Sequence, residues 1–120
     1  MIPQGTEVIV GVTHDPSFGP LMMFGMGGIH SELLEDVTFR IHPLTDVDAA
    51  EMVRSVKAYQ LLEGWRGSKP CDVKALEELL LRVSAMVEDL PQIGELDLNP
   101  VKALEVDNGY AVVDARILLS

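Results

Sequence analysis

The stretch TEVIVGVTHDPSFGPLMMFGMGG, residues 6–28, decides the fold of this chain. Valine occupies every second position from Val8 to Val12, which predicts a β-strand over residues 6–13 with one apolar side. The sequence DPSFGP at 15–20 is typical of a turn, and a second strand is expected over residues 21–24. Residues 6–24 are therefore predicted to form a β-hairpin.

The middle of the chain has the pattern of two helices, which follow a predicted third strand over residues 37–41. Thr45 and Asp48 have the spacing of a capping box, with aspartate in the place usually held by glutamate, so a helix is expected to begin there. After Asp72, leucine and valine recur at steps of three, four and seven residues until Pro91. This spacing predicts a longer helix that Asp72 caps and Pro91 ends.

The last part of the chain returns to strand patterns. Strands are predicted over residues 93–99 and 101–104, and a further strand over 110–117 follows a turn at 107–109. Strands are thus grouped at both ends of the chain with helices between them. This order predicts one α+β domain over residues 1–120, a largely antiparallel sheet packed with two main helices, rather than regular βαβ units.

Composition restricts the class of function. The 120 residues include 9 basic and 19 acidic side chains, for a net charge of −10, which disfavours nucleic acid and anionic membrane as partners. A nucleotide is still compatible, because a bound Mg²⁺ supplies positive charge locally. The single Cys71 permits no internal disulfide, and we find neither a signal peptide nor a membrane-spanning run. We expect a cytoplasmic protein.

Acidic and amide side chains gather on one side of the predicted strand at 93–99. Glu95, Asp97 and Asn99 alternate with leucines and so share a face, and Asp114 follows after the turn. Mg²⁺ prefers oxygen ligands and usually takes only one or two carboxylates from the protein. Asn99 and Asp114 could bind one ion, with Glu95 or Asp97 behind them. The alternative is that these acids merely face water.

The width of the turn decides between these alternatives. If Asn108 and Gly109 formed a two-residue hairpin loop, Asp114 would lie opposite Ala103. Asn99 would then be about 13 Å away, too far to share an ion. If the loop spans about residues 105–108 or slightly more, Asn99 lies opposite Asp114 and both point to the same face. The metal hypothesis therefore predicts a wide loop.

A glycine cluster follows the predicted second strand. Gly25, Gly27 and Gly28 could let phosphate groups approach backbone N–H groups, although a simple turn would have the same composition. Glu7 on the first strand could hydrogen-bond a ligand or could be a solvated residue at the edge of the sheet. Local sequence does not decide either case.

Six motifs follow one another along the chain: GTEVIVG at 5–11, DPSFGP at 15–20, GMGG at 25–28, LLEGWRG at 61–67, ELDLNP at 95–100 and VDAR at 113–116. Taken together, these motifs resemble the ADP-forming acetyl-CoA and acyl-CoA synthetases. The resemblance covers nearly the whole chain in the right order. Succinyl-CoA synthetase β subunits are more distant relatives, and the same ATP-grasp module occurs in protein acetyltransferases that are fused to a synthetase-like region.

The resemblance implies a fold, a reaction and a set of site residues. It implies the C-terminal subdomain of an ATP-grasp domain, which binds ATP or ADP with Mg²⁺ and transfers phosphoryl groups to and from a phosphohistidine. Asn99 and Asp114 match the metal ligands of the family. Asp97 matches an acid that faces the phosphohistidine, which makes it the candidate catalytic residue. The enzyme class implied is an ADP-forming acid–thiol ligase.

The nucleotide side of the site is implied by the same resemblance to include Glu7, Gly27 and Gly28. The family's N-terminal ATP-grasp half, with its lysines and adenine contacts, has no counterpart in this chain, and neither do the CoA-binding domains. We therefore expect those parts as partners and no activity from the chain alone. An apolar face left bare by the absent half could also promote homo-oligomers.

One alternative function stays open at this stage. The chain could be a non-catalytic ATP-grasp remnant, or the ATP-grasp part of a protein lysine acetyltransferase, that acts as a binding or regulatory module. The two possibilities share a fold and differ in nucleotide binding. The presence of both Asn99 and Asp114 favours the enzyme.

Overall fold

The predicted hairpin forms the centre of a β-sheet. In the computed structural model, which describes residues 6–27, 36–64 and 69–119, β1 (Thr6–Asp15) pairs antiparallel with β2 (Gly19–Met26). The turn is tighter than expected, because the strands extend to Asp15 and Gly19. The Asp15 carboxylate accepts hydrogen bonds from the N–H groups of Ser17 and Phe18 at 2.8 and 3.0 Å, and this closes the turn.

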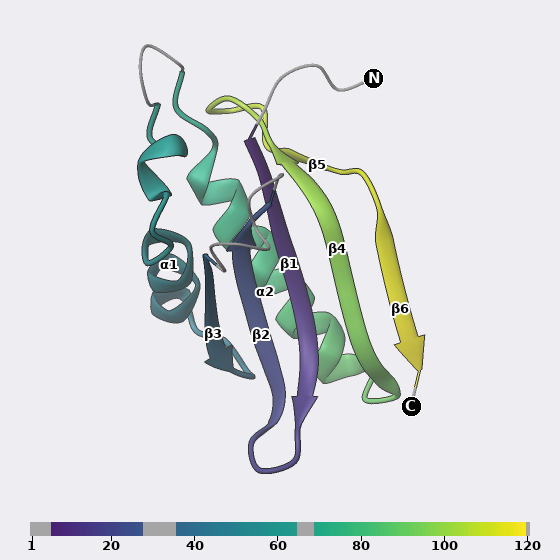
Figure 1. The fold of residues 1–120 in the computed structure, drawn as a ribbon. Coiled ribbons are helices and arrows are strands. Elements are labelled where there is room, and N and C mark those ends of the chain that lie inside the picture. Colours follow the sequence, from purple (N-terminus) through teal and green to yellow (C-terminus); the bar gives the residue numbers. More distant parts are fainter. Residues whose placement is uncertain (1–5, 28–35, 65–68, 120) are drawn as a thin grey trace.

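Four further strands extend the sheet on both sides of the hairpin (Figure 1). β3 (Val37–Ile41) pairs with β2, and β4 (Ile93–Ala103) pairs with β1. β5 (Tyr110–Val112) and β6 (Ala115–Leu119) both pair with β4. The order along the sheet is β3-β2-β1-β4-β5, and all the pairings are antiparallel. The predicted α+β class is confirmed.

Two α-helices lie where the sequence predicts them. α1 (Asp46–Arg54) begins with a complete capping box between Thr45 and Asp48. α2 (Val73–Asp89) is capped by Asp72 and ends just before Pro91, and a short 3₁₀-helix (Tyr59–Leu61) lies between the two. No helix in the described part of the chain is long and apolar enough to cross a membrane.

The helices cover only one face of the sheet, so the core lies on that side (Figure 1). Alternate strand residues and the inner faces of the helices fill it. The largest fully buried side chains are Val8, Val10, Met22, Phe24, Met52, Val53, Leu62, Leu76, Leu80, Val83 and Val101. The opposite face has no described element packed on it. We call it the open face.

The C-terminal part of the sheet differs from the single strand predicted over residues 110–117. The predicted strand over 110–117 is interrupted at residues 113–114. The helices do not extend behind β6 (Figure 1), and the alternating apolar residues Val113 and Ile117 are 51% and 48% exposed. Met23 is only partly buried, because it shares the open face with Phe39 and Gly11.

β2 and β3 approach each other closely at Gly25. A Cβ at Gly25 would lie 2.5 Å from Val37 Cγ1 and 3.2 Å from the Asp36 carbonyl oxygen. We expect Gly25→Ala to lower the free energy of unfolding by about 1–3 kcal/mol through overpacking. Urea unfolding of the variant and the wild type would measure the difference.

Shortening the neighbouring side chain provides the control. Because Val37 makes the closest contact, Val37→Ala should relieve part of the clash, so the double variant should be more stable than the sum of the single changes predicts. Strictly additive losses would show that the close approach does not exist.

Candidate functional site

Asn99 on β4 lies beside Asp114, which is in the two-residue connection between β5 and β6. The pairing of β4 with β5 places Val101 opposite Val112, and its pairing with β6 places Leu98 opposite Ala115, so the same register runs through the interruption between them. The Asn99 N–H donates to the Asp114 carbonyl oxygen at 3.1 Å. Directly opposed side chains have Cβ atoms about 4.5–5.5 Å apart, within reach of one ion. The wide loop that the metal hypothesis demands is present.

Both side chains retain free oxygen atoms. Asp114 and Asn99 are exposed, and one Asp114 oxygen, Oδ1, accepts a hydrogen bond from the Ala115 N–H at 2.9 Å. Within residues 6–27, 36–64 and 69–119, no group of three or more His, Cys, Asp or Glu side chains could hold a metal. The protein therefore offers one amide oxygen and one carboxylate, a donor set that fits Mg²⁺ whose other ligands are water and phosphate.

A β-bulge in β4 lies at this pair. Val10 on β1 faces Leu98 and Val8 faces Val101, so Asn99 and Pro100 together oppose a single β1 residue. After the bulge the alternation is reversed: Val101 is buried, and the next residue, Lys102, lies on the open face.

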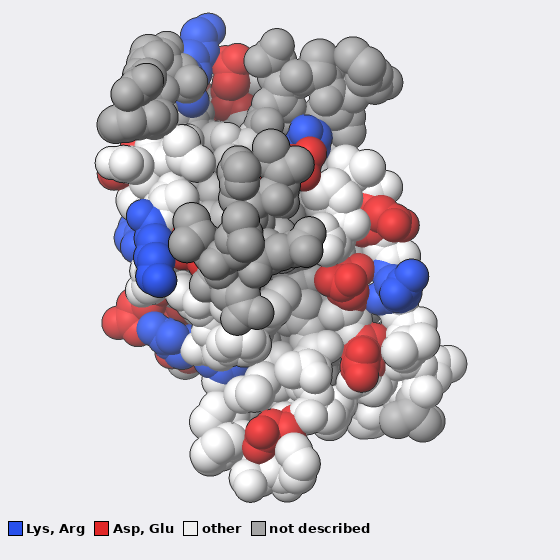
Figure 2. All heavy atoms as spheres, viewed as in Figure 1, with Lys and Arg blue, Asp and Glu red and all other residues white. Residues whose placement is uncertain are grey.

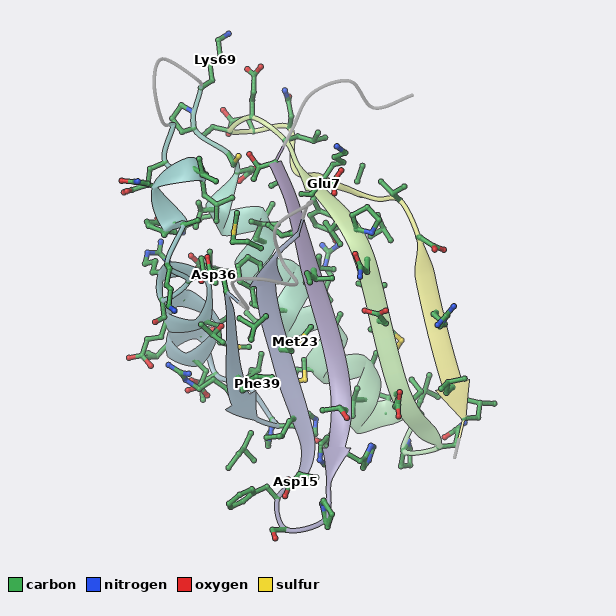
Figure 3. The ribbon with its side chains drawn as sticks, in the orientation of Figure 1. Glu7, Asp15, Met23, Asp36, Phe39 and Lys69 are labelled. Carbon is green, nitrogen blue, oxygen red and sulfur yellow. The ribbon has the colours of Figure 1, made fainter. Side chains whose placement is uncertain are left out.

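Glu7 and Lys102 form an ion pair across β1 and β4. The two residues are register partners, and Lys102 Nζ donates to Glu7 Oε2 at 3.0 Å. Gly27 lies against the same glutamate: its N–H donates to the Glu7 carbonyl oxygen at 2.9 Å, and a Cβ on Gly27 would be 3.3 Å from Glu7 Cβ. Figure 3 shows Glu7 where β1 passes β4. Gly28 lies outside the described residues.

Lys102 was missed by sequence reasoning. Simple alternation from Leu96 and Leu98 places it on the helix side of the sheet, and only the bulge brings it to the open face. Pro100 inside a strand pattern was the available signal, because proline within a sheet commonly marks a bulge.

Asp97 lines a hollow on the open face with a volume of about 240 Å³. Gly11 forms its floor: a Cβ there would be 3.2 Å from Met23 Cε, so a larger residue would fill part of the space. Arg116 lies directly opposite Asp97, and Glu95 lines the same hollow. Arg116 belongs to the VDAR motif, to which sequence reasoning assigned no individual role.

The open face changes in character across the sheet. Cross-strand partners run from Phe39 through Met23 and Gly11 to Asp97 and Arg116. The β2–β3 side is therefore apolar, and Figure 3 shows Met23 and Phe39 there. The β4–β6 side is charged, with acidic groups around a basic group in Figure 2. Such a surface can accept a ligand with one apolar part and one phosphate-bearing part, provided that a cation offsets the acids.

Comparisons with known proteins show the family to which this chain belongs. The ATP-grasp domain family model matches residues 1–119. The chain is 56% identical over 119 residues to acetate–CoA ligase (ADP-forming) I from Archaeoglobus fulgidus, which covers 99% of this chain and 17% of that relative. It is 52% identical over 120 residues to the beta subunit of acetate–CoA ligase (ADP-forming) II from Pyrococcus furiosus, which covers 99% of this chain and 51% of the subunit.

A solved structure shares the fold. Acetyl-coenzyme A synthetase 1 of Ca. Korarchaeum cryptofilum, in complex with coenzyme A and Mg-AMPPCP, superposes with a TM-score of 0.93 at 47% identity, over 100% of this chain and 55% of that chain. The chain thus spans about half of the separate beta subunit and about one sixth of the longer ligase. The chain belongs to the ATP-grasp domain family, and its close relatives are the ADP-forming acetyl-CoA synthetases.

Proposed function

We propose that this chain forms the metal-binding side of the nucleotide site of an ADP-forming acyl-CoA synthetase, which transfers phosphoryl groups between ATP or ADP and a phosphohistidine. The observation that carries the proposal is the juxtaposition of Asn99 and Asp114 across β4 and the β5–β6 connection. The high identity to acetate–CoA ligases supports it. So does the related synthetase with Mg-AMPPCP and a phosphohistidine segment pointing towards its nucleotide-binding site.

Asn99 and Asp114 would hold Mg²⁺ through one amide oxygen and one carboxylate oxygen. When bound, the ion offsets the charge of the nucleotide phosphates, which phosphoryl transfer needs more than covalent help from the protein. Asn99 projects from β4, and Asp114 projects from the short β5–β6 connection that is hydrogen-bonded to it, so the register of the sheet sets their separation.

Asp97 is proposed to orient the imidazole of the phosphohistidine. Its carboxylate lines the hollow beside Gly11, and because glycine has no side chain, there is room for a ring to approach. A carboxylate that accepts a hydrogen bond from one imidazole nitrogen fixes the ring and leaves the other nitrogen for phosphoryl transfer. Arg116, opposite Asp97, offsets part of the negative charge.

Glu7 and Gly27 are proposed to line the nucleotide side of the site. Lys102 holds the Glu7 carboxylate from the adjacent strand, which keeps that side chain in one place on the open face. The absence of a side chain at Gly27 permits the close approach of this backbone to Glu7. Gly28 remains part of the proposal from sequence alone.

The partner proposed is the remainder of a synthetase: an N-terminal ATP-grasp half and CoA-binding domains, on the same or a separate chain. The relatives extend well beyond the residues matched here, which supports this arrangement. The open face, with no described element packed on it, is where the other half would close over the nucleotide. The chain without these parts is expected to be inactive.

Removal of the carboxylate ligand tests the metal role. In the assembled synthetase, Asp114→Ala should weaken Mn²⁺ binding in the presence of ADP and lower the rate of ATP formation by at least about 100-fold, because one of two protein ligands is lost. Electron paramagnetic resonance of free Mn²⁺ would give the affinity, and a coupled assay the rate.

Asp89→Ala is the matched control, since Asp89 is an exposed acid at the far end of α2. It removes the same charge and should leave both measurements unchanged. Wild-type activity and Mn²⁺ affinity in Asp114→Ala would remove this residue from the mechanism.

Asp97→Asn tests the role of the acid in the hollow. The amide keeps the size of the side chain but accepts hydrogen bonds less strongly, so phosphoryl transfer from the phosphoenzyme to ADP should slow by about 10²-fold. Mn²⁺ affinity should stay near that of the wild type, because the metal ligands are intact. Rapid-quench measurement of labelled phosphoenzyme would follow the transfer step.

Glu95→Gln provides the comparison for this variant, because Glu95 lines the same hollow two residues earlier. It should slow transfer far less than Asp97→Asn. Equal effects of the two substitutions would indicate a general effect of charge and would contradict a specific role for Asp97.

A further inference from the structure

The loop between β4 and β5 is held from outside by the segment just before α2. Residues 104–109 form this loop, and residues 69–72 contact it at several points. We infer that Asp72 is a positioning residue for the metal pair: by holding this loop wide, it sets the register that brings Asn99 opposite Asp114. The inference rests on the proposed function, because it concerns the same metal ligands.

Asp72 joins the loop to α2 through one hydrogen bond to the helix and two to the loop. Its Oδ1 accepts a hydrogen bond from the Ala75 N–H at 3.2 Å, which caps the helix. Its Oδ2 accepts one from the Gly109 N–H at 3.0 Å, and its own N–H donates to the Leu104 carbonyl oxygen at 2.7 Å. The residue therefore holds both ends of the loop, and its two carboxylate oxygens serve two separate elements.

The loop needs such a constraint because its sequence favours a different turn. Asn108-Gly109 is a strong signal for a two-residue hairpin loop. That loop would place Asp114 opposite Ala103 and separate it from Asn99. In the observed loop the Leu104 N–H instead donates to the Gly109 carbonyl oxygen at 3.0 Å, and Ala103 pairs with Tyr110.

The wide loop also requires an unfavourable backbone conformation, and hydrogen bonds to the segment before α2 offset its conformational energy. Asp107 adopts a φ of 74°, a conformation uncommon for residues other than glycine, and Gly109 has a φ of 77°. The Val106 N–H donates to the Pro70 carbonyl oxygen at 3.1 Å, which adds a second tie to the same segment. The ion pair between Lys69 and Glu105, at 3.6 Å, is largely exposed and contributes little.

Asp72→Asn in the intact synthetase tests the inference. Asparagine caps helices as well as aspartate does, so one oxygen can still serve the Ala75 N–H. Its NH₂ group cannot accept from the Gly109 N–H, and this hydrogen bond is lost. We expect faster hydrogen exchange at the Asn99 and Val113 amides, and Mn²⁺ binding in the presence of ADP weakened about tenfold.

A second variant of Asp72 and a control at the cap of α1 complete the test. Asp72→Ser also preserves a strong cap but has a single short oxygen, so it should reproduce both changes even if the asparagine variant folds poorly. Thr45→Ala removes the cap of α1, away from the loop, and should lower stability without changing exchange at Asn99 and Val113 or the Mn²⁺ affinity.

The outcomes separate this inference from the proposed function. Wild-type exchange and Mn²⁺ affinity in both Asp72 variants would overturn the inference, as would identical changes in Thr45→Ala. If Asp114→Ala itself leaves Mn²⁺ affinity unchanged, the proposed metal site fails. Faster exchange at Asn99 and Val113 in the Asp72 variants would then still support the role of Asp72 in setting the register, without its consequence for metal binding.

Discussion

The pairing register of β4 with β5 and β6 is the constraint on which the site depends. Because side chains alternate along a strand, a slip of one residue would turn Asp114 to the side opposite Asn99. The same register is found before and after the interruption at residues 113–114, as the pairs Val101–Val112 and Leu98–Ala115 show. Backbone hydrogen bonds from Asn99 to Asp114 and from Val113 to Pro100 cross the interruption, so the alignment of Asp114 with Asn99 is kept.

Among the described residues, the helices cover one face of the sheet and no element packs on the other, so the register decides which side chains are available to a ligand. On the helix side, Leu96, Leu98 and Val101 are buried, and their burial holds β4 in place. The residues between them are thereby directed to the open face. Small residues keep that face accessible, since a side chain at Gly11 would contact Met23 within the hollow beside Asp97. The core thus packs on the helix side of the sheet, and the open face is the side that a ligand can reach.

Much of this arrangement could be predicted from the sequence, for identifiable reasons. The alternating valines of β1 and the caps at Thr45 and Asp72 are local signals, and local signals determine where elements begin. The Asn99–Asp114 pairing could be stated only as a condition on loop width, because hydrogen bonds from a distant segment decide that width.

The bulge at Asn99 and Pro100 reverses the alternation, and for this reason Lys102 was not expected on the open face. The local sequence pattern also could not show which strands the helices would cover. Ile117 has the alternation of a buried residue, yet it is exposed because α2 does not extend behind β6.

The charge of the open face explains why a cation would be integral to a nucleotide site here. Glu95, Asp97 and Asp114 lie on the charged side, where Arg116 is the nearby counter-charge, while Lys102 is already paired with Glu7. A nucleotide that approached this surface with its phosphates bare would meet a net negative charge. The divalent ion that we propose for Asn99 and Asp114 would offset that repulsion beside the carboxylate of Asp97. On this proposal, the same acids that disfavour a bare anion would favour a metal-bound one.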